Sequence, residues 1–317
     1  MNFFLSKHYT EFEEFYQDSF RWNLEFRKLD AGAFKGYIGL IDIGDVQVGK
    51  IKLNCKIDQS GISPRGFRTF VLPADKRQSF EWLNHQIGDK DLILFSRKGD
   101  LEAISFSNFY HYMISVEENM LEDFIAQHSL NQLGKSLGEN EKVFRLNRGY
   151  FLNLQTFLEI LFNRLERKPY LIHSESFQYQ VRERLLRMML DVFERKQYQE
   201  QGPLDSKRDD ALRKVRDYIQ KSDLKNLSIG QLTRIGEISE RSLQYAFLDH
   251  FGLTPKAYLT QVRLNEARTA LSNPTNKELV KNIADAVGFH HPGQFAIKYK
   301  ELFGESPTET RAGFRQS

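Results

Sequence analysis

The sequence predicts an α+β protein in which a β-rich N-terminal half, completed by helices, precedes an all-α C-terminal domain. Three observations support this prediction. Residues 21–116 carry many short runs rich in Phe, Ile, Val and Tyr, separated by Gly, Asp, Asn and Pro, as in a set of short strands. From about residue 117 the apolar residues recur every three or four positions, which is the period of amphipathic helices. Residues 208–317 contain one two-helix pattern twice.

Length and composition describe a globular chain of two domains. The 317 residues, at roughly 150 residues per domain, correspond to about two domains. The 26 Phe and 13 Tyr exceed what a disordered chain carries. No apolar run approaches the ~18 residues of a membrane span, and the N-terminus lacks the features of a signal peptide. Because the single cysteine, Cys55, excludes an internal disulfide framework, we expect a cytoplasmic protein with no membrane association.

The β-rich region divides into strands at its turn signals. Segments 34–43 and 46–55 flank a turn at Gly44, and the number and spacing of such segments favour a small sandwich or barrel. Within 46–55 the apolar residues shift from even-numbered to odd-numbered positions next to Gly49. Such a shift predicts a bulge in that strand. A short helix is expected upstream, within Tyr9–Phe20, where apolar residues have helical spacing.

Longer helices are expected between about 117 and 197. Apolar stripes run through 151–165 and 177–192, and each fits one face of a helix. The stripe at 177–192 suits either packing against the β-rich region or pairing with a second copy of the chain. The first domain is therefore predicted to span 1–200.

A polar segment at 201–207, which contains Gly202 and Pro203, predicts a linker. The second domain, 208–317, holds 17 Lys and Arg against 13 Asp and Glu, whereas the rest of the chain holds 28 against 29. The whole positive surplus thus lies in the second domain, which favours a polyanionic partner at that end.

The repeated pattern of the second domain is a helix, a tight turn at a glycine and a second helix. Its copies span 227–252 and 279–304, with turns at Gly236 and Gly288. Two crossed helices of this size with a glycine-containing turn form a helix-turn-helix. Segment 255–273 joins the copies as a third helix, and at 1.5 Å per residue it forms a rod of about 25 Å. The two units can then reach successive major grooves, about 34 Å apart, if the DNA bends slightly or the units tilt.

Four motifs of this domain carry a family resemblance. They are S-x-R-x-L-x-x-x-F at 239–247, FGLTPKAYL with RLNEAR at 251–268, IADAVGF at 283–289, and F-x₃-YK-x₂-FGESP at 295–307. With these motifs, residues 209–311 resemble the AraC/XylS transcription regulators. The resemblance implies a sequence-specific DNA-binding regulator that acts as an activator. The β-then-helix order of the first 200 residues is similar to the cupin-like sensing barrel and dimerisation helices of such regulators.

The first recognition helix presents, by position in the family's motif, Ser239, Glu240, Arg241, Gln244 and Tyr245. Arginine pairs with guanine and glutamine with adenine in the major groove, so Arg241 and Gln244 are the candidates for base reading. A phosphate or solvent contact is the alternative for Arg241.

The second recognition helix presents His290, His291, Pro292, Gly293, Gln294 and Lys298. The side chains of Pro292 and Gly293 cannot hydrogen-bond a base edge, so we expect this unit to read less sequence than the first. Gln294 and His291 remain candidates for base reading, and Lys298 is expected to contact the DNA backbone.

The sequence contains no phosphate-binding loop, nucleophile elbow or clustered metal-binding histidines. We therefore expect no enzymatic activity, cofactor or metal. The expected partners are double-stranded DNA, RNA polymerase, a second copy of the chain and a small effector in the β-rich domain. Two alternatives stay open: a ligand-free regulator controlled by a protein partner, and a cupin enzyme fused to a DNA-binding module.

Overall fold

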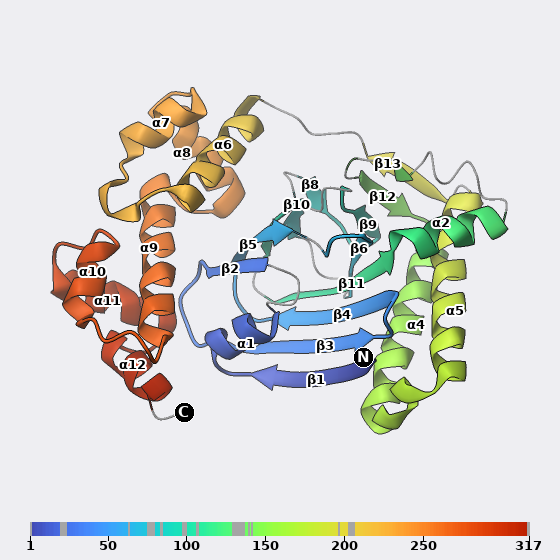
Figure 1. Ribbon diagram of the computed structural model, residues 1–317. Helices are drawn as coiled ribbons and strands as arrows, with labels where there is room; N and C mark the ends of the chain where they lie inside the picture. Colours follow the sequence, from blue (N-terminus) through green and yellow to red (C-terminus); the bar gives the residue numbers. More distant parts are fainter. Residues whose placement is uncertain are drawn as a thin grey trace.

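The protein is described by a computed structural model with a β-rich part and a helical part (Figure 1). The described residues are 2–315 except 20–23, 63, 75–79, 83–84, 97–99, 106–107, 129–136, 139, 141, 196 and 202–206. The predicted fold class is confirmed, because sheets and packed helices precede a C-terminal part that is entirely helical.

The described strands form two antiparallel sheets. The larger sheet has the spatial order β1 (Phe3–Tyr9), β3 (Gly36–Asp42), β4 (Val46–Leu53), β11 (Phe109–Glu117), β6 (Phe67–Pro73), β9 (Asp91–Leu94), β12 (Lys142–Leu146) and β13 (Tyr198–Gln201). The smaller sheet has the order β2 (Leu24–Lys28), β5 (Ile57–Ile62), β10 (Asp100–Ser105), β7 (Phe80–Trp82) and β8 (His85–Ile87).

The larger sheet has an apolar core on each face. One core lies between the two sheets and contains Ile38 and Ile51 from the larger sheet with Phe26 and Ile57 from the smaller. The other lies between the larger sheet and its covering helices, which Figure 1 shows beside β3 and β4. The two-sheet core is the interior of the predicted barrel or sandwich, and we call it the barrel interior.

The predicted bulge next to Gly49 is wrong. The pairing of β4 runs without interruption from Val46 to Leu53 with β11 and from Gln47 to Leu53 with β3. Val48 faces the helices and Ile51 faces the barrel interior, so the strand is buried on both faces. Both faces of the strand need apolar residues. The shift from even-numbered to odd-numbered apolar positions therefore requires no extra, bulged residue.

The two long helices, α4 (Arg148–Arg167) and α5 (Glu175–Glu194), bury their stripes against the larger sheet. Asn147 and Ser174 cap their N-termini by accepting from Gly149 N and Phe177 N. The α5 residues Val181 and Leu185 are 5% and 0% exposed and belong to this core. Packing against the β-rich region is therefore the role of the α5 stripe, and pairing with a second copy through this stripe is excluded.

Three further helical segments belong to the β-rich part: α1 (Phe12–Ser19), α2 (Glu118–Gln127) and the 3₁₀ turn η2 (Pro169–His173). Sequence reasoning did not foresee β12 and β13, which pair with one another at the edge of the larger sheet. β13 ends at Gln201, and the next described helix begins at Lys207. Most of the predicted linker, 202–206, lies outside the described residues.

The C-terminal domain contains the predicted pair of helix-turn-helix units. Its helices are α6 (Lys207–Lys221), η3 (Leu224–Asn226), α7 (Ile229–Gly236), α8 (Glu240–Phe251), α9 (Pro255–Ser272), α10 (Val280–Ala286), α11 (Pro292–Phe303) and α12 (Pro307–Arg315). The first unit is α7 with α8 and the second is α10 with α11. Helix α9 runs between the two units (Figure 1).

Each unit has its own apolar core, and α9 contributes to both. Tyr258 and Val262 in its first half pack with the first unit, whereas Leu264 and Leu271 pack with the second. The eighteen-residue helix therefore fixes the separation and rotation of the two units. This arrangement agrees with the connecting helix predicted at 255–273.

The first contact between the two domains centres on Asp58 of β5. Its carboxylate accepts from Arg216 Nη2 and from the Tyr258 hydroxyl, each at 2.5 Å. Arg27 Nη1 lies 3.9 Å from the same carboxylate. The side chains of Asp58 and Arg216 are 0% and 3% exposed. A buried ion pair thus joins the smaller sheet to α6 and α9.

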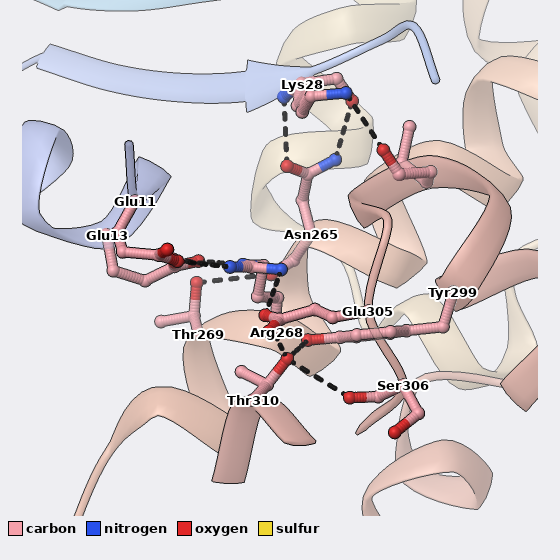
Figure 2. Close-up of polar contacts among 11 residues, drawn as sticks. Glu11, Glu13, Lys28, Asn265, Arg268, Thr269, Tyr299, Glu305, Ser306 and Thr310 are labelled. Atoms are coloured by element: carbon pink, nitrogen blue, oxygen red, sulfur yellow. Dashed lines mark hydrogen bonds and ion pairs between the residues drawn. The ribbon is translucent and has the colours of Figure 1, made fainter. Parts of the chain in front are cut away.

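The second contact between the domains lies along α9 (Figure 2). Arg268 donates to Glu13 of α1 at 2.8 Å and also contacts Glu305 at 2.9 Å. Asn265 exchanges two hydrogen bonds of 2.9 Å with the backbone of Lys28. The amide thus satisfies an N–H and a C=O at the end of β2 in the way a neighbouring strand would.

Candidate nucleic-acid interface

The first recognition helix, α8, is defined by its caps. The Ser239 side chain accepts from Ser242 N at 3.1 Å, and Gly252 ends the helix at φ 64°. The helix buries one face, including Leu243 and Phe247, in the core of the first unit. Its other face is exposed and carries all five predicted residues: Ser239, Glu240, Arg241, Gln244 and Tyr245.

Arg241 is aligned along this exposed face by Tyr245, one helical turn away. Its guanidinium lies 5.6 Å from the centre of the tyrosine ring, and Nη2 donates to the hydroxyl at 3.5 Å. A cation over an aromatic face is favourable by about 0.5–1 kcal/mol at an exposed site. Tyr245 therefore restricts the arginine to the outward surface of α8.

The second recognition helix, α11, begins with Pro292 and ends at Gly304 with φ 82°. It buries Phe295 and Tyr299 in the core of the second unit. The predicted residues His290, His291, Gln294 and Lys298 are all exposed.

His290 lies close to an ion pair at the turn before α11. Its Nδ1 is 3.3 Å from Asp285 Oδ1, and Lys225 Nζ donates to the other oxygen at 2.7 Å. The hydrogen bond from Lys225 lowers the pKa of the Asp285 carboxyl. His290 is thus positioned at the edge of the exposed surface of α11.

The turn of the second unit requires glycine. Gly288 has φ 93°, and an added Cβ would lie 3.0 Å from both Arg263 Cζ and Lys225 O. In the first unit the left-handed position falls on Glu237, with φ 52°, and Gly236 precedes it. The predicted turn glycine of the first unit therefore lies one residue before the turn's left-handed residue.

The two recognition helices match residue for residue, because each has twelve residues and ends at a left-handed glycine. In this match Phe295 and Tyr299 take the core positions of Leu243 and Phe247.

Three positions of the second helix then correspond to the exposed residues of the first. Gly293 corresponds to Arg241, Ala296 to Gln244 and Ile297 to Tyr245. Sequence reasoning missed Ala296 and Ile297, although the spacing of the buried aromatic residues could have revealed this register.

Two lysines of the β-rich domain contact the C-terminal ends of the recognition helices. Lys56 Nζ donates to Phe251 O at the end of α8 at 2.5 Å. Lys28 Nζ donates to Leu302 O near the end of α11 at 2.9 Å. A cation is favourable at a helix C-terminus. The β-rich domain therefore orients both recognition helices from the side opposite their exposed N-terminal residues.

The described residues contain no group of three or more His, Cys, Asp and Glu side chains that could hold a metal ion. None of the described helices combines the length and apolar character needed to cross a bilayer. The candidate site is the exposed faces of α8 and α11, because they carry the residues predicted to contact DNA.

Comparison with known proteins finds matches to the C-terminal domain. Residues 232–313 match a family model described as "Helix-turn-helix domain". The chain is 38% identical over 98 residues to "XylDLEGF operon transcriptional activator 2" of Pseudomonas putida, covering 31% of this chain and 62% of that protein. It is 39% identical over 95 residues to "Probable thc operon regulatory protein" of Rhodococcus erythropolis, covering 29% of this chain and 28% of that protein.

A solved structure is similar over the same part of the chain. A probable AraC family transcriptional regulator from Rhodopseudomonas palustris is 35% identical, with a TM-score of 0.32. The match covers 33% of this chain and 97% of that one. The chain spans less than two thirds of the length of either curated relative. The C-terminal domain of the chain belongs to the AraC/XylS family of helix-turn-helix transcription regulators.

Proposed function

We propose that the protein is a sequence-specific DNA-binding transcription activator that responds to a small effector bound in its β-rich domain. The observation that carries the DNA-binding half of this proposal is the pair of exposed recognition helices held by α9. Lys298 and Lys300 on α11 supply exposed positive charge for contacts with phosphates. Activation is supported by the printed name of the Pseudomonas putida relative.

The first unit carries most of the direct base reading. We assign to Arg241 two hydrogen bonds with a guanine and to Gln244, on the same exposed face, pairing with an adenine. Glu240 and Ser239 at the helix start are positioned beside them. The nine predicted residues of both units are the contacts that we assign to DNA.

A selection from random duplexes tests this proposal. The full chain should enrich a defined site, and Arg241→Ala should weaken binding by about 1–3 kcal/mol and relax specificity at one base pair. Arg234→Ala, which removes another exposed arginine of the first unit, is the matched control. Equal effects of the two substitutions on every base pair would refute the assigned contact.

The effector half of the proposal rests on three buried polar atoms in the barrel interior. Within the described residues, Gln59 Nε2, Trp82 Nε1 and His111 Nδ1 have no hydrogen-bond partner. The three residues are 4%, 1% and 5% exposed. An unsatisfied buried polar atom costs about 1–3 kcal/mol, so three in one interior call for a ligand that satisfies them.

The sheet register places two of these atoms on one rung of the smaller sheet. Phe26, Gln59, Ala103 and Trp82 lie side by side on neighbouring strands. The small Ala103 stands between Gln59 and Trp82, which are two strands apart, or about 10 Å. His111 extends from the larger sheet, where its partner Ile51 belongs to the interior core.

The chemistry of these groups supports an uncharged effector. Burial lowers the pKa of His111 to about 3, so its ring is neutral. The buried charges of these strands are engaged elsewhere, as Asp58 is with Arg216 and Lys50 with Glu159. We therefore assign to the interior a neutral, mostly apolar molecule whose oxygen atoms accept hydrogen bonds.

Strand β5 connects this interior to the DNA-binding domain. Ile57 and Gln59 face the interior, whereas Asp58 and Ser60 contact Arg216 and Gln220 of α6. A ligand that moves Gln59 would move Asp58 with it. We propose this strand as the route from effector to recognition helices.

A thermal-shift screen of uncharged metabolites tests the effector. A compound of the proposed class should raise the melting temperature of the full chain, and this shift should be reduced in Gln59→Leu. If no compound raises the melting temperature and one protein co-purifies with the chain, control by a protein partner is supported instead.

The remaining assignments follow from the same proposal. We place a second copy of the chain on the outer faces of α4 and α5, where Ile160 and Tyr179 are both 60% exposed. RNA polymerase is the expected partner of an activator, and the cytoplasm its expected location. No catalytic reaction is part of the proposal.

A further inference from the structure

The second recognition helix presents side chains without hydrogen-bonding groups where the first presents its base readers. Gly293, Ala296 and Ile297 stand at the positions of Arg241, Gln244 and Tyr245 in the residue-for-residue match. All three are exposed, and Ile297 is 62% exposed. The second unit is therefore built differently from the first at the surface that faces DNA.

Packing does not explain these residues. An added Cβ at Gly293 would meet nothing within 4 Å, and the backbone there is not left-handed. The core of the second unit is already filled by Phe295 and Tyr299 on the opposite face of α11. Gly293 and Ile297 therefore matter for their position, because they stand where the first unit presents Arg241 and Tyr245.

The partner must accept an apolar contact next to positive charge. Lys298 follows Ile297 directly, and the exposed Lys300 lies two residues further along the helix. In the major groove of DNA, only thymine offers an apolar group, its 5-methyl, while phosphates lie on either side. The missing side chain at Gly293 lets the helix backbone approach the base edges.

We propose that the second helix-turn-helix unit recognises thymine through van der Waals contact of Ile297 with the 5-methyl group. This inference rests on the proposed DNA-binding function and names the feature that the second unit reads. The first unit reads hydrogen-bonding groups, and the second unit reads a methyl group.

Uracil scanning of a bound duplex tests the inference. The probe is the duplex that the full chain selects from a random pool, with each thymine replaced in turn by deoxyuridine. Uracil keeps every hydrogen-bonding group of thymine and lacks only the methyl. Because burying one methyl-sized group changes affinity about fourfold, we expect a loss of that size at one or two thymines of the second half-site.

The variant Ile297→Ala should bind the thymine duplex about as weakly as the wild type binds the uracil duplex, and replacing thymine by uracil should not weaken it further. Ile297→Val should retain part of the preference for thymine over uracil. Arg241→Ala should keep this whole preference, while its binding to the other half-site is weakened. Since Ile297 is 62% exposed, these variants should fold, and an unchanged melting temperature checks this.

The outcomes separate the inference from the proposed function. The assignment of Ile297 is wrong if a duplex is selected but no uracil replacement in the second half-site lowers the affinity. It is also wrong if uracil lowers the affinity of Ile297→Ala as much as that of the wild type. If no duplex is selected at all, the DNA-binding proposal fails and the inference fails with it.

Discussion

Replacing Asp58 by alanine would remove the anion at the centre of the contact between the two domains. Asp58 is the hydrogen-bond acceptor for both Arg216 and Tyr258, and the Arg216 side chain is only 3% exposed. Without the carboxylate, a buried guanidinium would lose its counter-ion. Removing one partner of a buried ion pair costs about 3–5 kcal/mol, so we expect the free energy of unfolding to fall by that amount.

Urea unfolding of the full chain, followed by circular dichroism, measures this loss. The matched control is Asp285→Ala, which removes an exposed aspartate that also pairs with a cation, Lys225. Its unfolding midpoint should remain close to that of the wild type, because exposed ion pairs contribute little. Arg216→Ala should lower the free energy of unfolding much less in the Asp58→Ala variant than in the wild type. Coinciding midpoints of the two single aspartate variants would refute a buried, charge-based interface.

Three other perturbations follow from the structure. His111 has a pKa of about 3 when folded and about 6.5 when unfolded, so protons favour the unfolded chain between these values. Lowering the pH from 6.5 to 5 should therefore cost wild type about 2 kcal/mol more than His111→Leu, and parallel stability curves would argue against a buried neutral ring. Lys298→Ala should weaken DNA binding uniformly and reduce the salt slope of the affinity by about 1; an unchanged slope would remove Lys298 from the phosphate contacts. Gly288→Ala should lower the melting temperature, because a Cβ would meet Arg263 and Lys225 O at φ 93°, whereas Gly293→Ala should leave it unchanged.

Local patterns predicted the DNA-binding domain well. Its helices, turns and caps depend on residues a few positions apart, such as Ser239 with Ser242 and Gly304 at the end of α11. The stripe of α5 was predicted as well, but its periodicity alone could not decide between a sheet and a second copy of the chain. Only the packing of Val181 and Leu185 in the core decides this.

Long-range features were beyond sequence reasoning. The sequence alone favours a bulge at Gly49, because the pattern does not reveal that β4 is covered on both faces. The partners of Asp58, Lys28 and Arg268 lie far away in the chain, so no local pattern of the sequence reveals these contacts. The three unsatisfied atoms of the barrel interior also emerge only from the sheet register.

The register of the second recognition helix was within reach of the sequence. The spacing of Phe295 and Tyr299 equals that of Leu243 and Phe247, and matching these pairs places Ile297 opposite Tyr245. The polar residues Gln294 and Lys298 instead favour another match, because side chains that hydrogen-bond to DNA are the usual contacts of a recognition helix. That match leaves out Ile297.

We expect the two recognition helices, held by α9, to bind one face of a DNA duplex. Hydroxyl-radical footprinting of the full chain on its selected duplex measures this arrangement. We predict two protected segments with centres about 10 base pairs apart, one helical turn, and Arg241→Ala should weaken protection of one segment before the other. A single protected segment, or protection without preference for any sequence, would contradict this mode of binding.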